Sequence, residues 1–224
     1  RLAQEAEAKK VTLESGRILE GYPYIVVALG QDKMQLKGLE HTLSICGKPE
    51  EATELYERLD TLIQKKEGKI AMGFGGNPKD TSAVRGGPAF ELLFNVHTYL
   101  KKKGVRENFE LTFFAPMAKP GQKMGEKALV MMDKMFKMTN VSKKVGTKIT
   151  HFEEDGICFA DETKLESDLT MFISAGTGHH ILKESGLPLS DAGFVITNEY
   201  NEIGGFDGIY AIGDSASLMG PEWR

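Results

Sequence analysis

Between residues 69 and 116 the sequence alternates between patterns typical of strands and of a helix. The apolar run KIAMGF is followed by a glycine-rich stretch, by AFELLFNVHTYLKKKG with apolar residues at helical spacing, and by the apolar run FELTFFAP. A strand, a loop, a helix and a strand in this order form a β-α-β unit, whose strands are parallel and whose crossover is right-handed. This unit indicates an α/β fold.

The remaining patterns extend this prediction with further strands, helices and small antiparallel additions. The segment PEEATELYERLDTLIQKKEG is a predicted helix, with apolar residues at Ala52, Leu55, Leu59 and Leu62 and a glycine at its end. The methionines of KMGEKALVMMDKMFKM also recur near helical spacing. This spacing favours packing of the methionines in the core over a soft-metal site. The other expected elements are strands at 9–13, 22–29 (a buried run), 148–152, 194–197 and 209–212, a helix at 126–138, a hairpin-like pair followed by a buried strand within 155–176, and a helix in HHILKESG.

The composition excludes some classes of protein. With 224 residues, 41% of them hydrophobic, a net charge of −4 and basic residues interleaved with acidic ones, the chain lacks the basic stripe of a nucleic-acid-binding protein. No apolar stretch approaches the roughly 18 to 20 residues that span a bilayer. The chain does not begin with Met and runs directly into a strand pattern. We therefore expect a soluble piece of a longer protein, cytoplasmic or peripheral on a membrane.

The glycine-rich stretch GFGGNPKDTSAVRGGPAFELL lies where a dinucleotide fold places its pyrophosphate loop. Its spacing does not match G-x-G-x-x-G, Pro88 occupies the helix start, and the next strand ends without an acidic residue for a ribose. A loop that has lost its nucleotide is favoured over a working NAD site, and both remain open. The candidate residues are Gly73, Gly75, Gly76, Gly86, Gly87 and Glu91.

The two cysteines, Cys46 and Cys158, are far apart and lack CxxC spacing, so neither a disulfide framework nor a zinc site is indicated. An isolated cysteine is more often structural than reactive, and Cys158 alternates with apolar neighbours as a small core residue does. The five histidines show no ligand-type spacing, and the pair His179–His180 is expected to open a helix. We assign no metal.

The run GIYAIGDSAS places Asp214 at the end of a buried strand, among small residues. A carboxylate in this position can accept hydrogen bonds from a ligand polyol that approaches the backbone. Asp214 could equally be the N-cap of a short helix. The residues alone leave both interpretations open.

Several segments together resemble the two-dinucleotide-binding-domain flavoproteins of the pyridine nucleotide-disulfide oxidoreductase superfamily. GIYAIGDSAS is similar to their second flavin-binding motif, YIVVALGQDK to their ATG-type strand end, and DLTMFISAGTG to the return strand from the inserted domain. The resemblance implies that Asp214 and Gly213 contact the ribityl chain of FAD, and that Ala28 and Gly30 belong to the same site. It implies a Rossmann-like three-layer β/β/α domain with incomplete pieces of the flavin domain.

Within that superfamily the sequence is most similar to the sulfide:quinone oxidoreductases. LEHTLSICGKPEEATELYERL resembles their Ser-x-Cys segment before a helix, and GGPAFELLFNVHTYLKKKGVRENFELTFFAP resembles a second stretch of that family. The resemblance implies that Cys46 takes up sulfide sulfur and that electrons pass through FAD to quinone. A second redox cysteine, the first pyrophosphate motif and a membrane-binding region are expected outside this chain.

Two alternatives remain. A type II NADH:quinone dehydrogenase would use NAD(H) at Gly73, Gly75, Gly76 and Glu91, and a non-catalytic dinucleotide-fold module would bind a protein partner. We expect partial flavin-domain pieces at residues 1–65 and 166–224 and an inserted NAD(P)-binding-like domain at 66–165. The oligomeric state, with a homo-oligomer as one option, stays open.

Overall fold

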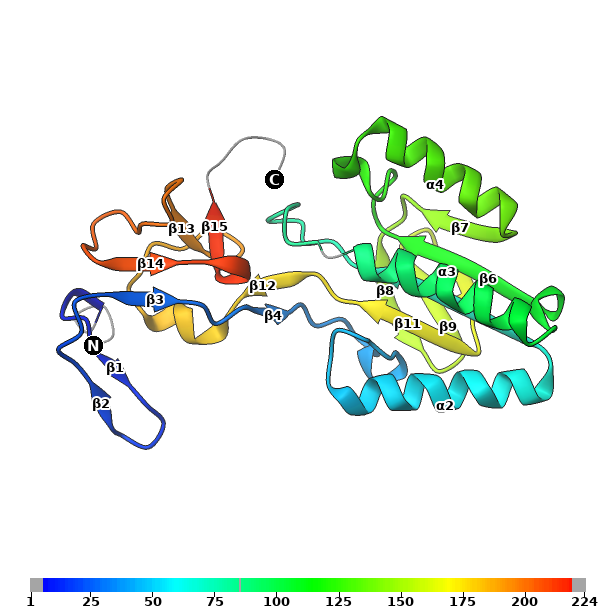
Figure 1. The fold of residues 1–224 in the computed structure, drawn as a ribbon, viewed down its shortest axis with the longest axis horizontal. Helices are drawn as coiled ribbons and strands as arrows, with labels where there is room; N and C mark the ends of the chain where they lie inside the picture. Colours follow the sequence, from blue (N-terminus) through cyan, green and yellow to red (C-terminus); the bar gives the residue numbers. More distant parts are fainter. Residues whose placement is uncertain (1–5, 85, 219–224) are drawn as a thin grey trace. The chain divides into compact units, whose positions relative to one another are not determined.

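The computed structural model describes residues 6–84 and 86–218 of the chain and divides it into two compact units (Figure 1). Unit 1 consists of Arg1–Met34, Asn77–Ala83 and Gly176–Arg224, and unit 2 of Gln35–Gly76 and Val84–Ala175. Each unit has its own hydrophobic clusters, so each is described by itself.

Unit 2 is built on a four-stranded parallel sheet. The strand order is β11-β5-β6-β7, and all three neighbouring pairs are parallel. The predicted β-α-β unit is present, with parallel β5 and β6 flanking the helix α3. The strands are β5 (Gly68–Phe74), β6 (Phe109–Ala115), β7 (Val141–Val145) and β11 (Leu169–Ile173), and the helix α3 is Gly87–Lys102.

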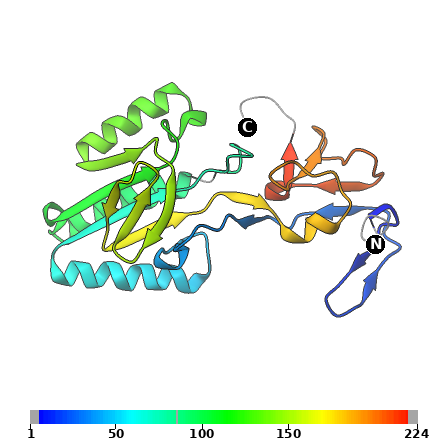
Figure 2. The same ribbon diagram turned by 180° about the vertical axis from the view of Figure 1, so that it is seen from behind.

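The two faces of the parallel sheet carry different layers. On one face α3 crosses in front of the strands, as Figure 1 shows, and α2 (Pro49–Lys65) and α4 (Glu126–Met138) complete that layer. On the other face, seen from behind in Figure 2, lies an antiparallel sheet in the order β10-β9-β8. Its strands are β8 (Ile149–Glu153), β9 (Gly156–Phe159) and β10 (Lys164–Glu166). The unit therefore has the predicted three layers, β/β/α.

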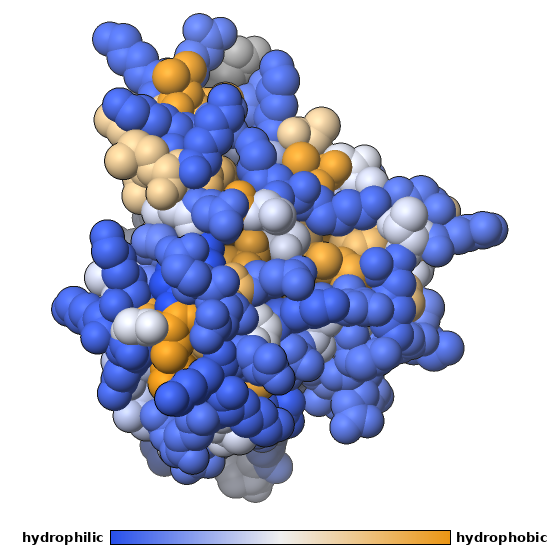
Figure 3. All heavy atoms as spheres, turned by 90° about the vertical axis from the view of Figure 1, so that its right-hand side faces the viewer, coloured by the Kyte–Doolittle hydropathy of each residue, from blue (hydrophilic) through white to orange (hydrophobic). Residues whose placement is uncertain are grey.

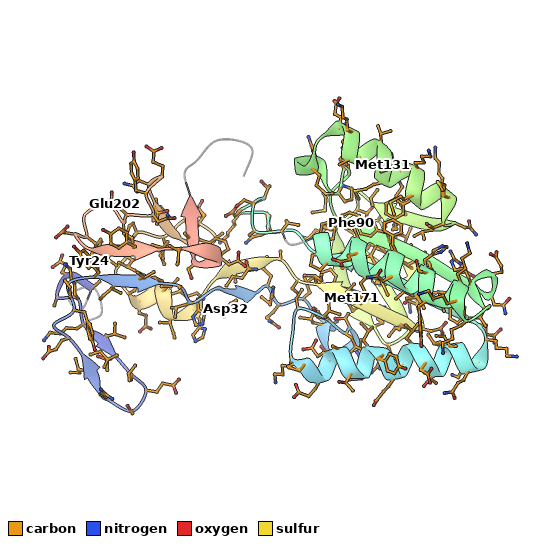
Figure 4. The ribbon with its side chains drawn as sticks, in the orientation of Figure 1. Tyr24, Asp32, Phe90, Met131, Met171 and Glu202 are labelled. Carbon is orange, nitrogen blue, oxygen red and sulfur yellow. The ribbon has the colours of Figure 1, made fainter. Side chains whose placement is uncertain are left out.

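Two adjacent phenylalanines of β6 show how this sheet separates two clusters. Successive side chains of a strand point to opposite faces, so Phe113 and Phe114 enter different layers. The Phe113 ring stacks at 4.6 Å on Phe90 of α3, which is labelled in Figure 4. The Phe114 ring lies 5.8 Å from Phe172 and joins the cluster under the antiparallel sheet. Both phenylalanines are fully buried.

The α2 helix follows its predicted pattern only in part. Leu55, Leu59 and Leu62 are buried, whereas Ala52 is exposed. The helix ends at Lys66, which has a φ of 64°, rather than at a glycine. A left-handed residue at this position lets its backbone N–H reach the Ile63 carbonyl and closes the last turn.

Unit 1 is built from short strand pairs. An amino-terminal hairpin forms from β1 (Val11–Thr12) and β2 (Ile18–Leu19), a strand that was not predicted, and β3 (Ile25–Val27) pairs in parallel with β14 (Ile209–Ala211). The other pairs are antiparallel β4 (Gln31–Lys33) with β12 (Gly176–Gly178) and parallel β13 (Val195–Thr197) with β15 (Ala216–Leu218). Leu182, Val195 and Ile209 belong to its buried cluster.

Several elements differ from the sequence predictions. The run at 22–29 is not a buried strand, because only Ile25–Val27 is extended and Val26 is 55% exposed. The helix predicted in HHILKESG is present as a short 3-10 helix, His180–Glu184. The β7 strand was not predicted, since Lys143 and Lys144 interrupt its apolar pattern. Most of the methionines expected in the core are exposed: Met124, Met131, Met135 and Met138.

The face of unit 2 that Figure 3 displays is mostly polar. Figure 3 shows hydrophilic side chains over most of the face that it displays, with smaller apolar areas between them. Among the residues that the structure describes, no helix combines the length and apolar character needed to cross a bilayer.

Candidate functional site

The two strand ends that carry the flavin-like motifs meet in unit 1. β3 and β14 pair in the register Ile25↔Ile209 to Val27↔Ala211, and the backbone N–H of Ile212 donates to the Val27 carbonyl at 3.0 Å. Parallel strands in register end at the same edge of a sheet. The segment after β3, with Ala28 and Gly30, therefore lies beside the segment after β14.

A side-chain hydrogen bond fixes this arrangement. The chain turns after β14 into a 3-10 turn at Gly213–Ser215, and the Ser215 hydroxyl donates to the Gly30 carbonyl at 3.1 Å. Ser215 is fully buried, although Gly30 and Ser215 are far apart in sequence. Four predicted residues, Ala28, Gly30, Gly213 and Asp214, are thus brought to one edge.

Gly30 and Gly213 leave that edge open. Their φ angles are 73° and 63°, in the left-handed region that favours glycine. A Cβ atom built on either residue would meet no heavy atom within 4 Å. Packing does not require glycine at these positions. The backbone conformation does, and the space beside each Cα is free.

Asp214 lies inside the 3-10 turn, whose N-cap is Ile212, so the N-cap interpretation of this aspartate is wrong. Its side chain is partly exposed. A carboxylate at a strand end beside two unobstructed glycines can accept hydrogen bonds from donor groups of a ligand. This edge of unit 1 can therefore hold a polyhydroxylated ligand.

A charged cluster of Asp32, His179 and His180, which was not predicted, lies at the pair formed by β4 and β12. Asp32 of β4, labelled in Figure 4, accepts hydrogen bonds from the His180 backbone N–H at 2.7 Å and ring nitrogen at 3.0 Å. The His179 and His180 rings stack at 4.5 Å, and His179 caps the 3-10 turn. Partial burial raises the pKa of Asp32, but the His180 hydrogen bonds and the two histidine charges outweigh it and lower the pKa. The pairing of β4 with β12 creates this cluster.

Cys46 belongs to unit 2 and lies in the predicted loop before α2. Its side chain is exposed and its backbone N–H donates to the Ser44 hydroxyl at 3.2 Å. The Glu51 carboxylate accepts from the backbone N–H groups of Ser44, at 3.1 Å, and of Lys48, at 3.2 Å. One helix residue thus holds both sides of the loop that presents the thiol to solvent.

Cys158 differs from Cys46 in its surroundings. It lies on β9 and is half-buried, so it is less buried than the small core residue that was predicted. Burial, followed by the nearby Glu153 carboxylate, raises the pKa of the Cys158 thiol. A thiol is a poor nucleophile compared with its thiolate. Cys158 is therefore the weaker candidate for redox chemistry.

The glycine-rich stretch has structural reasons for several of its glycines. A Cβ on Gly73 would lie 2.1 Å from the Phe114 carbonyl oxygen, and one on Gly86 would lie 2.5 Å from the Phe74 ring. Gly75 donates its N–H to the Ile173 carbonyl at 2.9 Å. Gly76 has ordinary clearance and Gly87 has open space. Packing thus accounts for two of the five glycines without a nucleotide.

The loop beyond Gly76 is held by Asn77. Asn77 is buried, and its side-chain amide donates to the Gly176 carbonyl at 2.8 Å while its oxygen accepts from the Lys79 N–H at 2.9 Å. Glu91, the candidate acidic residue, is exposed on α3. Arg85, which precedes Gly86 in the glycine-rich stretch, lies outside the described residues.

Replacing Gly73 with alanine should destabilise the chain, because the added methyl group must displace the β6 backbone. We expect a loss of about 1–3 kcal/mol in the free energy of unfolding, measured by urea denaturation. Gly87→Ala is the matched control. A Cβ atom at Gly87 would meet no heavy atom within 4 Å, so this substitution should lower the free energy of unfolding by less than Gly73→Ala does. Equal effects of the two substitutions would contradict the packing explanation.

The sequence pattern of the pyridine nucleotide-disulphide oxidoreductase family matches residues 3–223. The chain belongs to this family. The superfamily and the Rossmann-like α/β fold predicted from the sequence are thereby confirmed.

A sulfide:quinone enzyme of Aquifex aeolicus matches the chain in sequence and in structure. A sulfide-quinone reductase of Aquifex aeolicus (strain VF5) is 24% identical over an alignment of 225 residues. The alignment covers 93% of this chain and 49% of that protein. The crystal structure of the sulfide:quinone oxidoreductase from Aquifex aeolicus matches with a TM-score of 0.80 and 23% identity, over 95% of this chain and 50% of that one. The chain spans about half the length of these relatives.

Other solved structures share the fold. A ferredoxin reductase from Rhodopseudomonas palustris matches with a TM-score of 0.67 and 16% identity, over 95% of this chain and 48% of that one. An NAD-dependent persulfide reductase from A. fulgidus matches with a TM-score of 0.62 and 17% identity, over 92% of this chain and 36% of that one. The fold is thus shared by proteins whose names give different reactions.

Proposed function

We propose that the whole protein is an FAD-dependent oxidoreductase of the sulfide:quinone type. The observation that carries the proposal is the open edge in unit 1, where the Ser215 hydroxyl joins Gly30 to the turn that holds Asp214. The residues at this edge fit the ribityl chain of FAD, because the space beside Gly30 and Gly213 is free. The likeness to the sulfide:quinone enzyme of Aquifex aeolicus supports the choice of reaction.

Bound FAD would accept two electrons from the donor and pass them to the acceptor. Gly30 and Gly213 would let the cofactor approach the backbone, and Asp214 would accept hydrogen bonds from its hydroxyl groups. Ser215, held by the Gly30 carbonyl, would keep the two strand ends together while the ligand is bound. These roles use only residues of one unit.

Cys46 would be the residue that binds the sulfur of the substrate. Its thiol is exposed, and its loop is fixed by Glu51 rather than free to collapse. In the overall reaction HS⁻ loses two electrons and one proton and becomes sulfane sulfur, and the quinone takes up two electrons and two protons. A second cysteine and a membrane-associated region would come from the rest of the protein.

Substitution of Asp214 by alanine in the full-length protein tests the flavin site. A hydrogen bond to a charged group is worth about 1.5–3 kcal/mol, so the Kd of FAD should rise roughly 10- to 100-fold, measured by flavin fluorescence after removal of the cofactor. Asp207→Ala, which removes an exposed carboxylate of the same unit, is the control and should bind FAD normally. Equal affinities of the two variants would argue against the assignment of Asp214.

The second candidate function is a type II NADH:quinone dehydrogenase. The glycine-rich loop after β5 is in the right place for NADH, but packing explains Gly73 and Gly86, and Asn77 holds the loop. The β6 strand also ends at Ala115 and Pro116 without a carboxylate for the ribose. These features make sulfide the preferred donor. A non-catalytic module, the third candidate, would contain no flavin when purified at full length.

A further inference from the structure

Three potential ligand side chains lie together on the antiparallel sheet of unit 2. His151 and Glu153 are two residues apart on β8, so they point to the same face, and Cys158 on β9 is the cross-strand neighbour of His151. One potential ligand atom from each of the three residues lies within 4.8 Å of the others. Nitrogen, oxygen and sulfur donors of these types are those that bind zinc in proteins.

The hydrogen bonds of Thr150 set the tautomer of His151. The Thr150 hydroxyl lies 3.0 Å from the Cys158 carbonyl oxygen, which can only accept, so the hydroxyl proton is used there. The same hydroxyl lies 3.0 Å from His151 Nδ1 and must then accept from it. In a neutral imidazole, a proton on Nδ1 leaves Nε2 with a free lone pair. The outer partner thus prepares Nε2 as a ligand atom, as outer partners commonly do at metal sites.

His151 Nε2 lies 3.3 Å from Glu153 Oε1, an atom that carries only lone pairs. With a protonated ring this contact is an ion pair, and with a neutral ring that keeps its proton on Nδ1 the two atoms attract each other only through a cation between them. Glu153 is oriented from its other side, because Oε2 accepts from the Lys164 ammonium at 2.7 Å. A tetrahedral zinc ion with bonds of about 2.0–2.2 Å to nitrogen and oxygen places two such ligands roughly 3.3 Å apart. The observed spacing has this value.

We propose that His151, Glu153 and Cys158 form a binding site for a divalent transition-metal ion, zinc above all. The ligands are His151 Nε2, Glu153 Oε1 and the Cys158 sulfur, and a water molecule takes the fourth position. Binding replaces the thiol proton, which is released to solvent, and forms the metal–sulfur bond. Lys164 donates to Glu153 Oε2, which leaves Oε1 for the metal, and also donates to Asp155 at 2.6 Å.

Cobalt(II) titration of the full-length protein, purified without metal, tests this site. Thiolate-bound Co²⁺ has a sulfur-to-metal charge-transfer absorption that a site without sulfur lacks. We expect this absorption in the wild type and in Cys46→Ser, and its loss in Cys158→Ser. The cluster of Asp32, His179 and His180 is a second group with ligand spacing, but it contains no sulfur and cannot give the band.

A histidine pair supplies the matched control. His151→Ala should raise the Kd of the metal roughly 10- to 100-fold, whereas His41→Ala, at an exposed residue of the Leu39–His41 turn, should leave it unchanged. Should the Cys158 variant fail to fold, X-ray absorption of the zinc-loaded wild type decides, with one sulfur expected in the first coordination shell. A zinc shell without sulfur, or a charge-transfer band that Cys46→Ser abolishes, would overturn the proposal.

Discussion

Replacement of Cys46 by serine in the full-length protein is expected to lower the rate of sulfide-dependent flavin reduction by about a thousandfold or more, as for loss of other catalytic nucleophiles. Serine retains the size of the side chain but lacks the sulfur that binds the substrate. FAD should remain bound, because the predicted flavin contacts lie in unit 1. Stopped-flow absorbance under anaerobic conditions measures the rate.

Cys158→Ser is the matched control when both variants are purified without metal, since it makes the same chemical change at a half-buried strand residue. It should reduce the rate by less than a factor of ten. If the two variants lose activity equally, or if Cys46→Ser remains fully active, the catalytic assignment of Cys46 is wrong.

The second large effect is expected from Phe113→Ala. The Phe113 side chain is fully buried and its ring contacts those of Phe74, Phe90 and Phe136 at centroid distances of 5.7, 4.6 and 5.5 Å. Truncation removes buried apolar surface and leaves a cavity between the sheet and its helices. We expect the free energy of unfolding to fall by about 3–5 kcal/mol.

Met138→Ala provides the comparison, because Met138 is 74% exposed at the end of α4 in the same unit. Its free energy of unfolding should change by no more than about 0.5 kcal/mol. Urea denaturation followed by circular dichroism measures both variants. A small effect at Phe113 would show that this cluster does not stabilise the unit as described.

The β-α-β unit could be predicted because its signals are local and strong. The β5 and β6 strands are nearly continuous apolar runs, and α3 has apolar residues on one face with a proline in its first turn. The edge strand β7 could not be predicted in the same way. Its sequence VSKKV places two lysines in the middle of the strand, and pairing with β6 alone decides its conformation.

The part of the candidate site that lies within one sequence motif could be predicted. Gly213 and Asp214 follow a strand pattern, but their contact with the Gly30 segment depends on the pairing of β3 and β14, which the sequence does not specify. Asp32 and His180 are similarly joined only by the pairing of β4 with β12. The group of His151, Glu153 and Cys158 had a usable signal. An H-x-E pattern on a strand puts both side chains on one face.

Reduction of the flavin by sulfide through Cys46 can be measured by anaerobic titration of the full-length flavoprotein with sulfide and, separately, with NADH, with the flavin absorbance as the readout. We expect rapid bleaching by sulfide and none by NADH. Bleaching by NADH alone would contradict this expectation, make the glycine-rich loop a working nucleotide site, and leave Cys46 without a catalytic role.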